Sequence, residues 1–192
     1  MADLALAGRS LVASPLLPDP NFDRTVVLVL VHNDEGALGV VLNRPTDTRV
    51  GVPLPKWESL AADPAVVFVG GPVNHQAALC LARVSGGSLG GPETEADGSW
   101  IRVAGEVGTL DLDSEPAFLA NDLAALRIFA GYAGWGAGQL EAEIAAGAWW
   151  VVDADPSDVF SGDPDGLWKA VLRRQRGGLA LASAYPDDPS MN

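Results

Sequence analysis

Guanidinium and amide side chains beside turns are the first groups in this sequence that could recognise a ligand. Arg24 stands at the start of a β-branched apolar run, five residues after Asp19, and Arg44 directly follows Asn43 and precedes a proline. A guanidinium presents a planar set of donors that grips carboxylates and phosphates. We expect Arg24, Asn43 and Arg44 to bind a small anion or a partner protein. The competing interpretation is structural, with an Asp19–Arg24 ion pair and a proline-closed turn at Asn43.

A glycine-rich aromatic segment is the second candidate. Four glycines fall between residues 131 and 138, so the backbone there can approach another group closely. Tyr132 and Trp135 supply apolar faces with polar tips, and Gln139 opens the helix that we expect to follow. We therefore include Tyr132, Trp135 and Gln139 in the expected binding surface. The alternative is a strand-to-helix turn packed on the other tryptophans.

Residues for catalysis and metal binding are scarce. The chain has two histidines and one cysteine, without the spacing of a metal site. Residues 86–90 match G-x-S-x-G, but both histidines lie upstream and a polar loop follows, which excludes a nucleophile elbow. No nucleotide-binding glycine motif surrounds Gly70-Gly71, where we expect a tight turn, or alternatively an anion nest. We predict no catalytic residue, no metal and no cofactor, and a buried Cys80.

Charge and length limit the function classes further. The 192 residues carry 25 acidic and 12 basic side chains, a net charge of −13, which repels nucleic acid and anionic membranes. Arg173, Arg174 and Arg176 are too few to offset this field, and no helix-turn-helix is apparent, so direct DNA binding is disfavoured. The longest apolar run spans only 26–31, and the N-terminus lacks signal-peptide features. We expect a cytoplasmic protein that does not enter membranes.

The hydrophobic pattern predicts many short strands and few helices. Strands are expected at 10–14, 25–32, 38–43, 66–69, 77–84, 100–103, 107–112, 126–133 and 148–152, the eighth ending in a glycine-rich turn. Helices are expected at 55–62, 114–121, 138–146 and 164–175, the last capped by Asp163. Strands and helices do not alternate strictly, which indicates an α+β fold. We expect a polar loop at 85–98, a single domain over 8–176 after an extension at 1–7, and a disordered tail from 177 to 192.

Several phrases together go beyond a generic pattern. They are SPLLPDPNFDRTVV (14–27), HNDEGALGVVLNRP (32–45), FVGGPV (68–73), GYAGWGAGQLEAEIAAGAW (131–149), and PSDVF with DGLW within 156–168. Their combination resembles the YqgE/AlgH family of small bacterial proteins over residues 8–176. The resemblance implies a single α+β domain with a bifurcated, partly barrel-like mixed sheet flanked by helices. It implies no established enzyme activity.

The same resemblance brings a regulatory label. The family is associated with alginate synthesis in some bacteria and is described as a transcriptional regulator, without a proven DNA-binding mechanism. Some members carry a cysteine and an acidic residue just before the His-Asn turn, where this chain has Leu30 and Val31. A thiol switch at that strand is therefore not transferable to this chain.

The leading hypothesis is a non-enzymatic regulatory or adaptor protein that binds a partner protein or a small anion. The alternatives are a hydrolase or transferase whose arginine-lined pocket uses His32 or Asp19 as base, a direct DNA-binding regulator, and a purely structural subunit. Whether Arg24, Arg44 and the 131–139 segment line one cleft is the observation that best tests the leading hypothesis, and groups on opposite sides of the molecule would contradict it.

Overall fold

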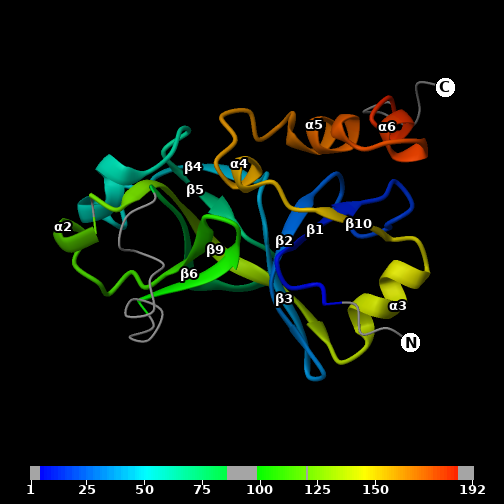
Figure 1. Ribbon diagram of the computed structural model, residues 1–192, viewed down its shortest axis with the longest axis horizontal. Helices are drawn as coiled ribbons and strands as arrows, with labels where there is room; N and C mark the ends of the chain where they lie inside the picture. The colour runs from blue at the N-terminus through cyan, green and yellow to red at the C-terminus, as the bar shows by residue number, and fades with distance from the viewer. Residues whose placement is uncertain (1–4, 86–98, 120, 186–192) are drawn as a thin grey trace.

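Ten strands and six short helical segments make up the part of the chain that the computed structural model describes, residues 5–85, 99–119 and 121–185 (Figure 1). The strands are β1 (Arg9–Ala13), β2 (Val26–Asn33), β3 (Gly36–Val41), β4 (Pro45–Arg49), β5 (Val66–Val69), β6 (Val73–Val84), β7 (Trp100–Ala104), β8 (Val107–Leu110), β9 (Leu123–Gly136) and β10 (Trp149–Asp153). The helices are the 3₁₀ turn η1 (Pro55–Leu60), α2 (Pro116–Leu119), α3 (Gln139–Ala145), α4 (Pro156–Val159), α5 (Leu167–Arg174) and α6 (Gly178–Ala182).

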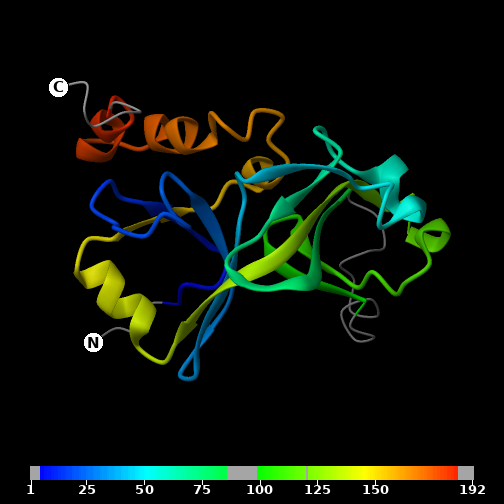
Figure 2. The same cartoon turned by 180° about the vertical axis from the view of Figure 1, so that it is seen from behind.

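One forked, curled sheet organises the molecule. Its main path runs β10-β1-β2-β3-β9-β6-β8-β7, and all of these neighbours are antiparallel. β5 pairs parallel with β9 and antiparallel with β4, so the sheet is mixed and branches at β9. Figures 1 and 2 show β9 running from one lobe of the molecule into the other. The predicted α+β class and bifurcated, partly barrel-like sheet are confirmed.

Three clusters of buried side chains fill the two lobes. One lies under α5 and includes Trp168, Phe68 and Phe129; a second surrounds Trp57 and Trp100 in the other lobe. The third joins Trp135 and Trp149 to Leu6, which is fully buried although it belongs to the predicted N-terminal extension. The third cluster forms the base of the site described below.

The expected glycine-rich turn after residue 133 is wrong, because β9 continues to Gly136. Ala133 to Gly136 pair with Gly39 to Gly36 of β3, so a neighbouring strand supplies the backbone partners that the glycines alone do not indicate. Gly138 then adopts a left-handed φ of 72° immediately before α3. The turn is displaced to 137–138, which leaves Tyr132 and Trp135 within the strand β9.

The helix boundaries also differ from expectation. The segment at 55–62 is a 3₁₀ turn, and α2 is shorter than predicted. α5 begins at Leu167, because the Asp163 carboxylate accepts from the Gly166 amide at 3.1 Å and closes a turn before the helix. Residues 178–182 form α6 where a disordered tail was expected. The predicted loop at 85–98 and the G-x-S-x-G match at 86–90 lie almost wholly outside the described residues.

Candidate functional site

Asp19 holds its own loop through a local turn rather than through Arg24. Its Oδ1 accepts from the backbone amide and the side-chain amide of Asn21, both at 2.9 Å. Arg24 has a left-handed φ of 51°, and its guanidinium lies 5.3 Å from the centre of the Trp168 ring. The expected Asp19–Arg24 pair therefore does not order the loop, and Arg24 packs toward α5.

Asn43 is a buried framework residue. Only 3% of it is exposed, its Oδ1 accepts from the Val26 amide at 3.0 Å, and its Nδ2 donates to the Arg24 carbonyl at 2.9 Å. The side chain thereby completes the hydrogen bonding of the backbone where β2 begins. It positions the loop that carries Arg24 while both of its polar groups are occupied.

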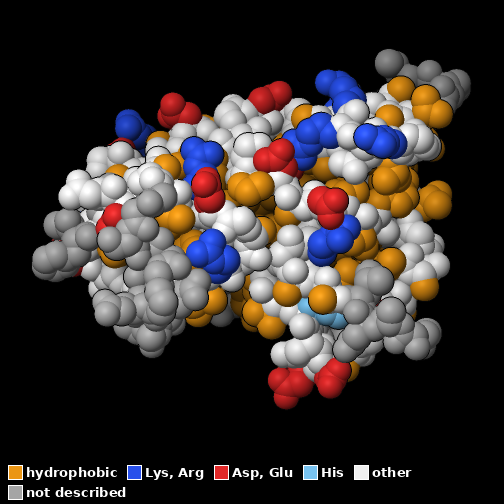
Figure 3. Space-filling model, in the orientation of Figure 1, with side chains coloured by type: hydrophobic (Ala, Val, Ile, Leu, Met, Phe, Trp, Pro, Cys, Tyr) orange, Lys and Arg blue, Asp and Glu red, His pale blue; other side chains and the backbone are white. Residues whose placement is uncertain are grey.

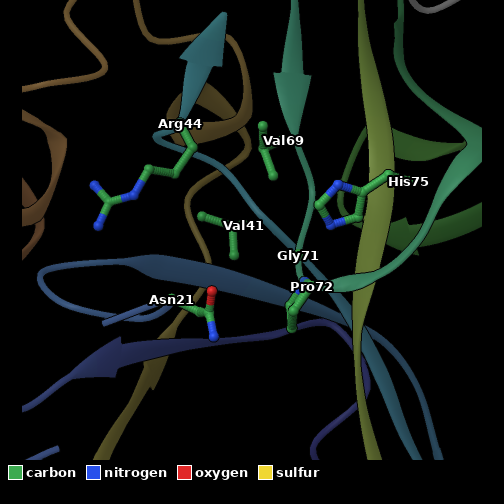
Figure 4. Close-up of a pocket in the computed structure, with 7 residues that line it drawn as sticks. All are labelled: Asn21, Val41, Arg44, Val69, Gly71, Pro72 and His75. Atoms are coloured by element: carbon green, nitrogen blue, oxygen red, sulfur yellow. The ribbon is translucent and has the colours of Figure 1, made fainter. Parts of the chain in front are cut away.

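Arg44 lines a surface hollow, here called the Arg44 hollow, of about 220 Å³. The lining consists of Asn21, Val41, Arg44, Val69, Gly71, Pro72 and His75. Figure 4 shows Arg44 and His75 on opposite sides, with Val69, Gly71 and Pro72 between them. Arg44 also donates from Nη2 to the Asp23 carbonyl, which ties it to the loop opposite. The hollow is thus lined by Arg44 on one side and His75 on the other, and the Arg44 guanidinium in Figure 4 points away from His75.

Gly70 and Gly71 let two backbone segments touch beside the Arg44 hollow. A Cβ atom on Gly71 would stand 2.2 Å from the Tyr132 carbonyl carbon, and Gly71 has a φ of 152°. The Gly70 amide donates to the Ala130 carbonyl at 2.9 Å, so it is already committed and does not serve an anion nest. These glycines hold the connection between β5 and β6 against β9, which is the tight-turn interpretation.

An aromatic pocket of about 650 Å³, here called the Trp135 pocket, lies next to the Arg44 hollow. Its lining is Leu17, Pro18, Asp19, Pro20, Phe22, Pro72, Gly134, Trp135, Gln139, Glu143, Ala146 and Ala148. The Phe22 and Trp135 rings stack with centroids 6.2 Å apart, and both rings pack on Trp149 at 5.3 and 6.0 Å. The wall is therefore apolar and aromatic, with polar groups at few points.

Glu143 is the principal polar group of the Trp135 pocket, and sequence analysis missed it. Its Oε2 accepts from the indole Nε1 groups of Trp135 at 2.9 Å and Trp149 at 2.8 Å. Its Oε1 accepts from the Gln139 Nε2 at 2.9 Å. Gln139 one helical turn earlier could have indicated the pairing, but the sequence does not show that both indoles converge on this carboxylate.

Pro72 belongs to both linings, so the Arg44 hollow and the Trp135 pocket adjoin. We call these two adjoining depressions together the Pro72 groove. Of the six predicted site residues, Arg44, Trp135 and Gln139 line it. Tyr132 is half-buried and packs against the core cluster under α5. Arg24 and Asn43 do not belong to either lining and support the loop that forms one wall.

The residues considered as bases or nucleophiles are engaged elsewhere. His32 Nε2 lies 2.7 Å from Glu141 Oε1, on the part of α3 that does not line the groove. A hydrogen bond to its own backbone amide, then one to His32, lowers the pKa of Glu141. Cys80 is buried, and desolvation raises the pKa of its thiol far above the usual range. Within the described residues, no cluster of three His, Cys, Asp or Glu side chains could hold a metal.

The fold defines a class: a single-domain α+β protein with a forked mixed sheet. The AlgH-like family model, DUF179, matches residues 10–180. The UPF0301 protein SCO2948 of Streptomyces coelicolor is 56% identical over 188 residues, covering 98% of this chain and 96% of the relative. A UPF0301 protein of Thermobifida fusca is 50% identical, covering 100% of this chain and 98% of the relative. The chain belongs to the AlgH-like family, whose biochemical function is not established.

Two solved structures share the fold. Protein DIP2367 of Corynebacterium diphtheriae superposes with a TM-score of 0.86 at 30% identity, covering 94% of this chain and 92% of the other. The solution structure of AlgH from Pseudomonas aeruginosa gives a TM-score of 0.66 at 31% identity, with 98% of each chain covered. The YqgE/AlgH resemblance seen in the sequence is thereby confirmed. Among the helices of the described residues, none has the length and apolar character needed to span a membrane.

Proposed function

We propose that this chain is a non-enzymatic regulatory or adaptor protein that binds a partner protein in the Pro72 groove. The observation that carries the proposal is the shared lining at Pro72, which places the hollow lined by Arg44 next to the pocket lined by Trp135 and Gln139. Recognition sites are concave, mostly apolar, and carry a few placed polar groups. The Pro72 groove fits this description on a rigid sheet.

The composition of the groove favours a protein segment over a metabolite. Its walls are proline, aromatic and aliphatic side chains along most of their length, with arginine and histidine at one end. Aromatic and arginine side chains carry most of the binding energy at protein interfaces. An extended segment of a partner could contact both parts of the groove at once.

The enzyme alternative has less support. A hydrolase or transferase needs a base within reach of the reacting group. His32 is bonded to Glu141 outside both linings, and the Asp19 carboxylate is held by Asn21. Arg44 and His75 in the Arg44 hollow are suited to holding an anionic group, and this is the role that we assign to them.

The charge distribution argues against nucleic acid as the partner. On the face in Figure 3, acidic and basic side chains are interspersed, and basic ones gather mainly over the helix α5 at upper right. Arg174 of that helix is paired with Asp158, at 2.7 and 2.5 Å. With a net charge of −13, this small basic cluster opposes the field of the whole chain.

Affinity capture with matched arginine variants tests the proposal. Arg44→Gln and Arg49→Gln remove the same charge five residues apart, and Arg49 is an exposed residue paired with Glu58 at 2.9 Å, outside the groove. We expect a protein captured by the wild type to be lost with Arg44→Gln and retained with Arg49→Gln. Its affinity, measured with the purified pair by calorimetry, should fall about tenfold or more in Arg44→Gln.

Equal capture by both variants would contradict the proposal. Substrate turnover by the purified protein that disappears with His32→Ala, in a variant that remains folded, would favour the enzyme alternative instead.

A further inference from the structure

The Trp135 pocket has a charge pattern opposite to that of the Arg44 hollow. All charged side chains in its lining are carboxylates, Asp19 and Glu143. The charged side chain in the lining of the Arg44 hollow is the Arg44 guanidinium, and the His75 imidazole lies in the same lining. The Pro72 groove is therefore polarised along its length, within a strongly acidic protein.

Neither carboxylate of the Trp135 pocket has a basic partner among the described residues. Hydrogen bonds from Asn21 hold Asp19, and hydrogen bonds from two indoles and Gln139 hold Glu143. These donors are all neutral, so the negative charges are oriented but not neutralised. A half-buried carboxylate in an aromatic wall favours a cation that comes from outside.

The aromatic rings add a second attraction for a cation. Phe22 is half-buried at the pocket, and its ring stacks on Trp135, which is 6% exposed. A guanidinium or ammonium over an aromatic face is stabilised by the ring quadrupole, most strongly when it is desolvated. The aliphatic stem of an arginine or lysine would pack on the prolines of the loop. The volume of about 650 Å³ accommodates such a side chain.

We infer that the Trp135 pocket receives a basic side chain of the partner segment, while the Arg44 hollow receives an acidic one. This inference rests on the proposed function and specifies its partner: a segment that carries an arginine or lysine and, a short distance along the chain, an aspartate or glutamate. Charge complementarity at the two ends then fixes the direction in which the segment lies.

Model peptides test the inference directly. The probes are acetylated, amidated peptides with one arginine and one glutamate separated by two to five glycines, in both orders, together with versions in which norleucine replaces arginine. The readout is the indole N–H signals of Trp135 and Trp149 in ¹H–¹⁵N spectra, assigned with Trp135→Phe and Trp149→Phe. These protons contact Glu143, so they report on the pocket itself. Free methylguanidinium is a separate arm that detects binding of a small cation.

Two carboxylate variants test the pocket, and a third is their control. Glu143→Gln and Asp19→Asn remove charge inside the pocket, whereas Glu141→Gln removes the same charge from the same helix outside it. We expect arginine peptides to shift both indole signals and norleucine peptides to leave them unchanged. We expect the affinity to fall about tenfold in Glu143→Gln and Asp19→Asn and to be unchanged in Glu141→Gln. If Glu143→Gln does not fold, the affinity of Asp19→Asn for the arginine peptides decides whether the inference holds.

The inference is overturned if norleucine peptides bind as well as arginine peptides, if no peptide shifts the indole signals, or if methylguanidinium alone binds as tightly as every peptide. It also fails if Glu143→Gln and Asp19→Asn bind like the wild type. A captured partner that depends on Arg44 but not on Glu143 or Asp19 would leave the proposed function intact and refute only this inference.

Discussion

Asn43 and Glu143 show how single side chains set the walls of the groove. Asn43 is 3% exposed and bonds the backbone on both sides of Thr25, which fixes the end of the loop that carries Asp19 and Phe22. Glu143 gathers two indoles and so fixes the orientation of the aromatic wall. Asn43 and Glu143 hold other groups in place through hydrogen bonds, whereas Arg44 next to Asn43 lies in the lining of the surface hollow. Sequence analysis singled out Arg44 and Trp135 by residue type alone, and both line the Pro72 groove.

Replacing Asn43 by alanine should destabilise the fold strongly. Asn43→Ala leaves the buried Val26 amide without its acceptor, and we expect the free energy of unfolding to fall by about 2 kcal/mol. Urea denaturation of wild type and variant measures this. The control is Asn33→Ala, whose side chain accepts from the Glu35 amide in an exposed turn and should cost less. Equal losses in both variants would refute the framework role of Asn43.

β9 lines one part of the Pro72 groove with Gly134 and Trp135 and packs against the Gly70-Gly71 connection beside the other. Its Ala133 to Gly136 stretch pairs with β3, while the Gly70-Gly71 connection packs on the backbone at Tyr132. Strand and helix types could largely be predicted from hydrophobic periodicity, as β1, β2 and β10 show. The continuation of β9 could not, because glycines carry no periodicity and the partner strand is nearly 100 residues away in the sequence. The proximity of the Arg44 hollow and the Trp135 pocket could not be predicted either, because residues far apart in the sequence form their walls.

The close approach at Gly71 predicts a sharp difference between two glycine variants. Gly71→Ala places a methyl group 2.2 Å from the Tyr132 backbone, and we expect a loss of about 3 kcal/mol in unfolding free energy. At Gly138, with a φ of 72° and no heavy atom within 4 Å of an added Cβ, Gly138→Ala should cost only about 1 kcal/mol. Denaturant titration of both variants is the measurement, and a Gly138→Ala loss that equals or exceeds that of Gly71→Ala contradicts this packing.

α3 is coupled to β2 through Glu141 and His32, and this coupling should appear in acid. A hydrogen bond from the Glu141 backbone amide and one from the His32 side chain hold the pKa of the Glu141 carboxyl below its ordinary value of 4.5 in the folded state. The stabilisation is therefore present above pH 4.5 and is lost as the pH falls through the lowered pKa. Glu141→Gln should flatten the fall of unfolding free energy below pH 4.5. A slope identical to that of the wild type would exclude this contribution of Glu141.

At the scale of the whole molecule, the protein presents an acidic surface and one polarised groove. A net charge of −13 disfavours nucleic acid, whereas the Pro72 groove offers a basic end, an aromatic wall and an acidic end. The sheet is continuous through β9, and both parts of the groove lie beside it. A segment that contacts both parts would need its basic and acidic side chains at matching positions.

Photo-crosslinking in the bacterium tests most directly whether the Pro72 groove is the binding surface. Val73, 37% exposed and 3.9 Å from a Cβ built on Gly134 of the Trp135 pocket, is replaced by p-benzoylphenylalanine; Ile101, 56% exposed on β7, is the control position. We predict a crosslinked partner at position 73 that is absent at position 101 and disappears when Arg44→Gln is added. The same crosslinks at both positions, or none at position 73, would contradict the assignment of the groove.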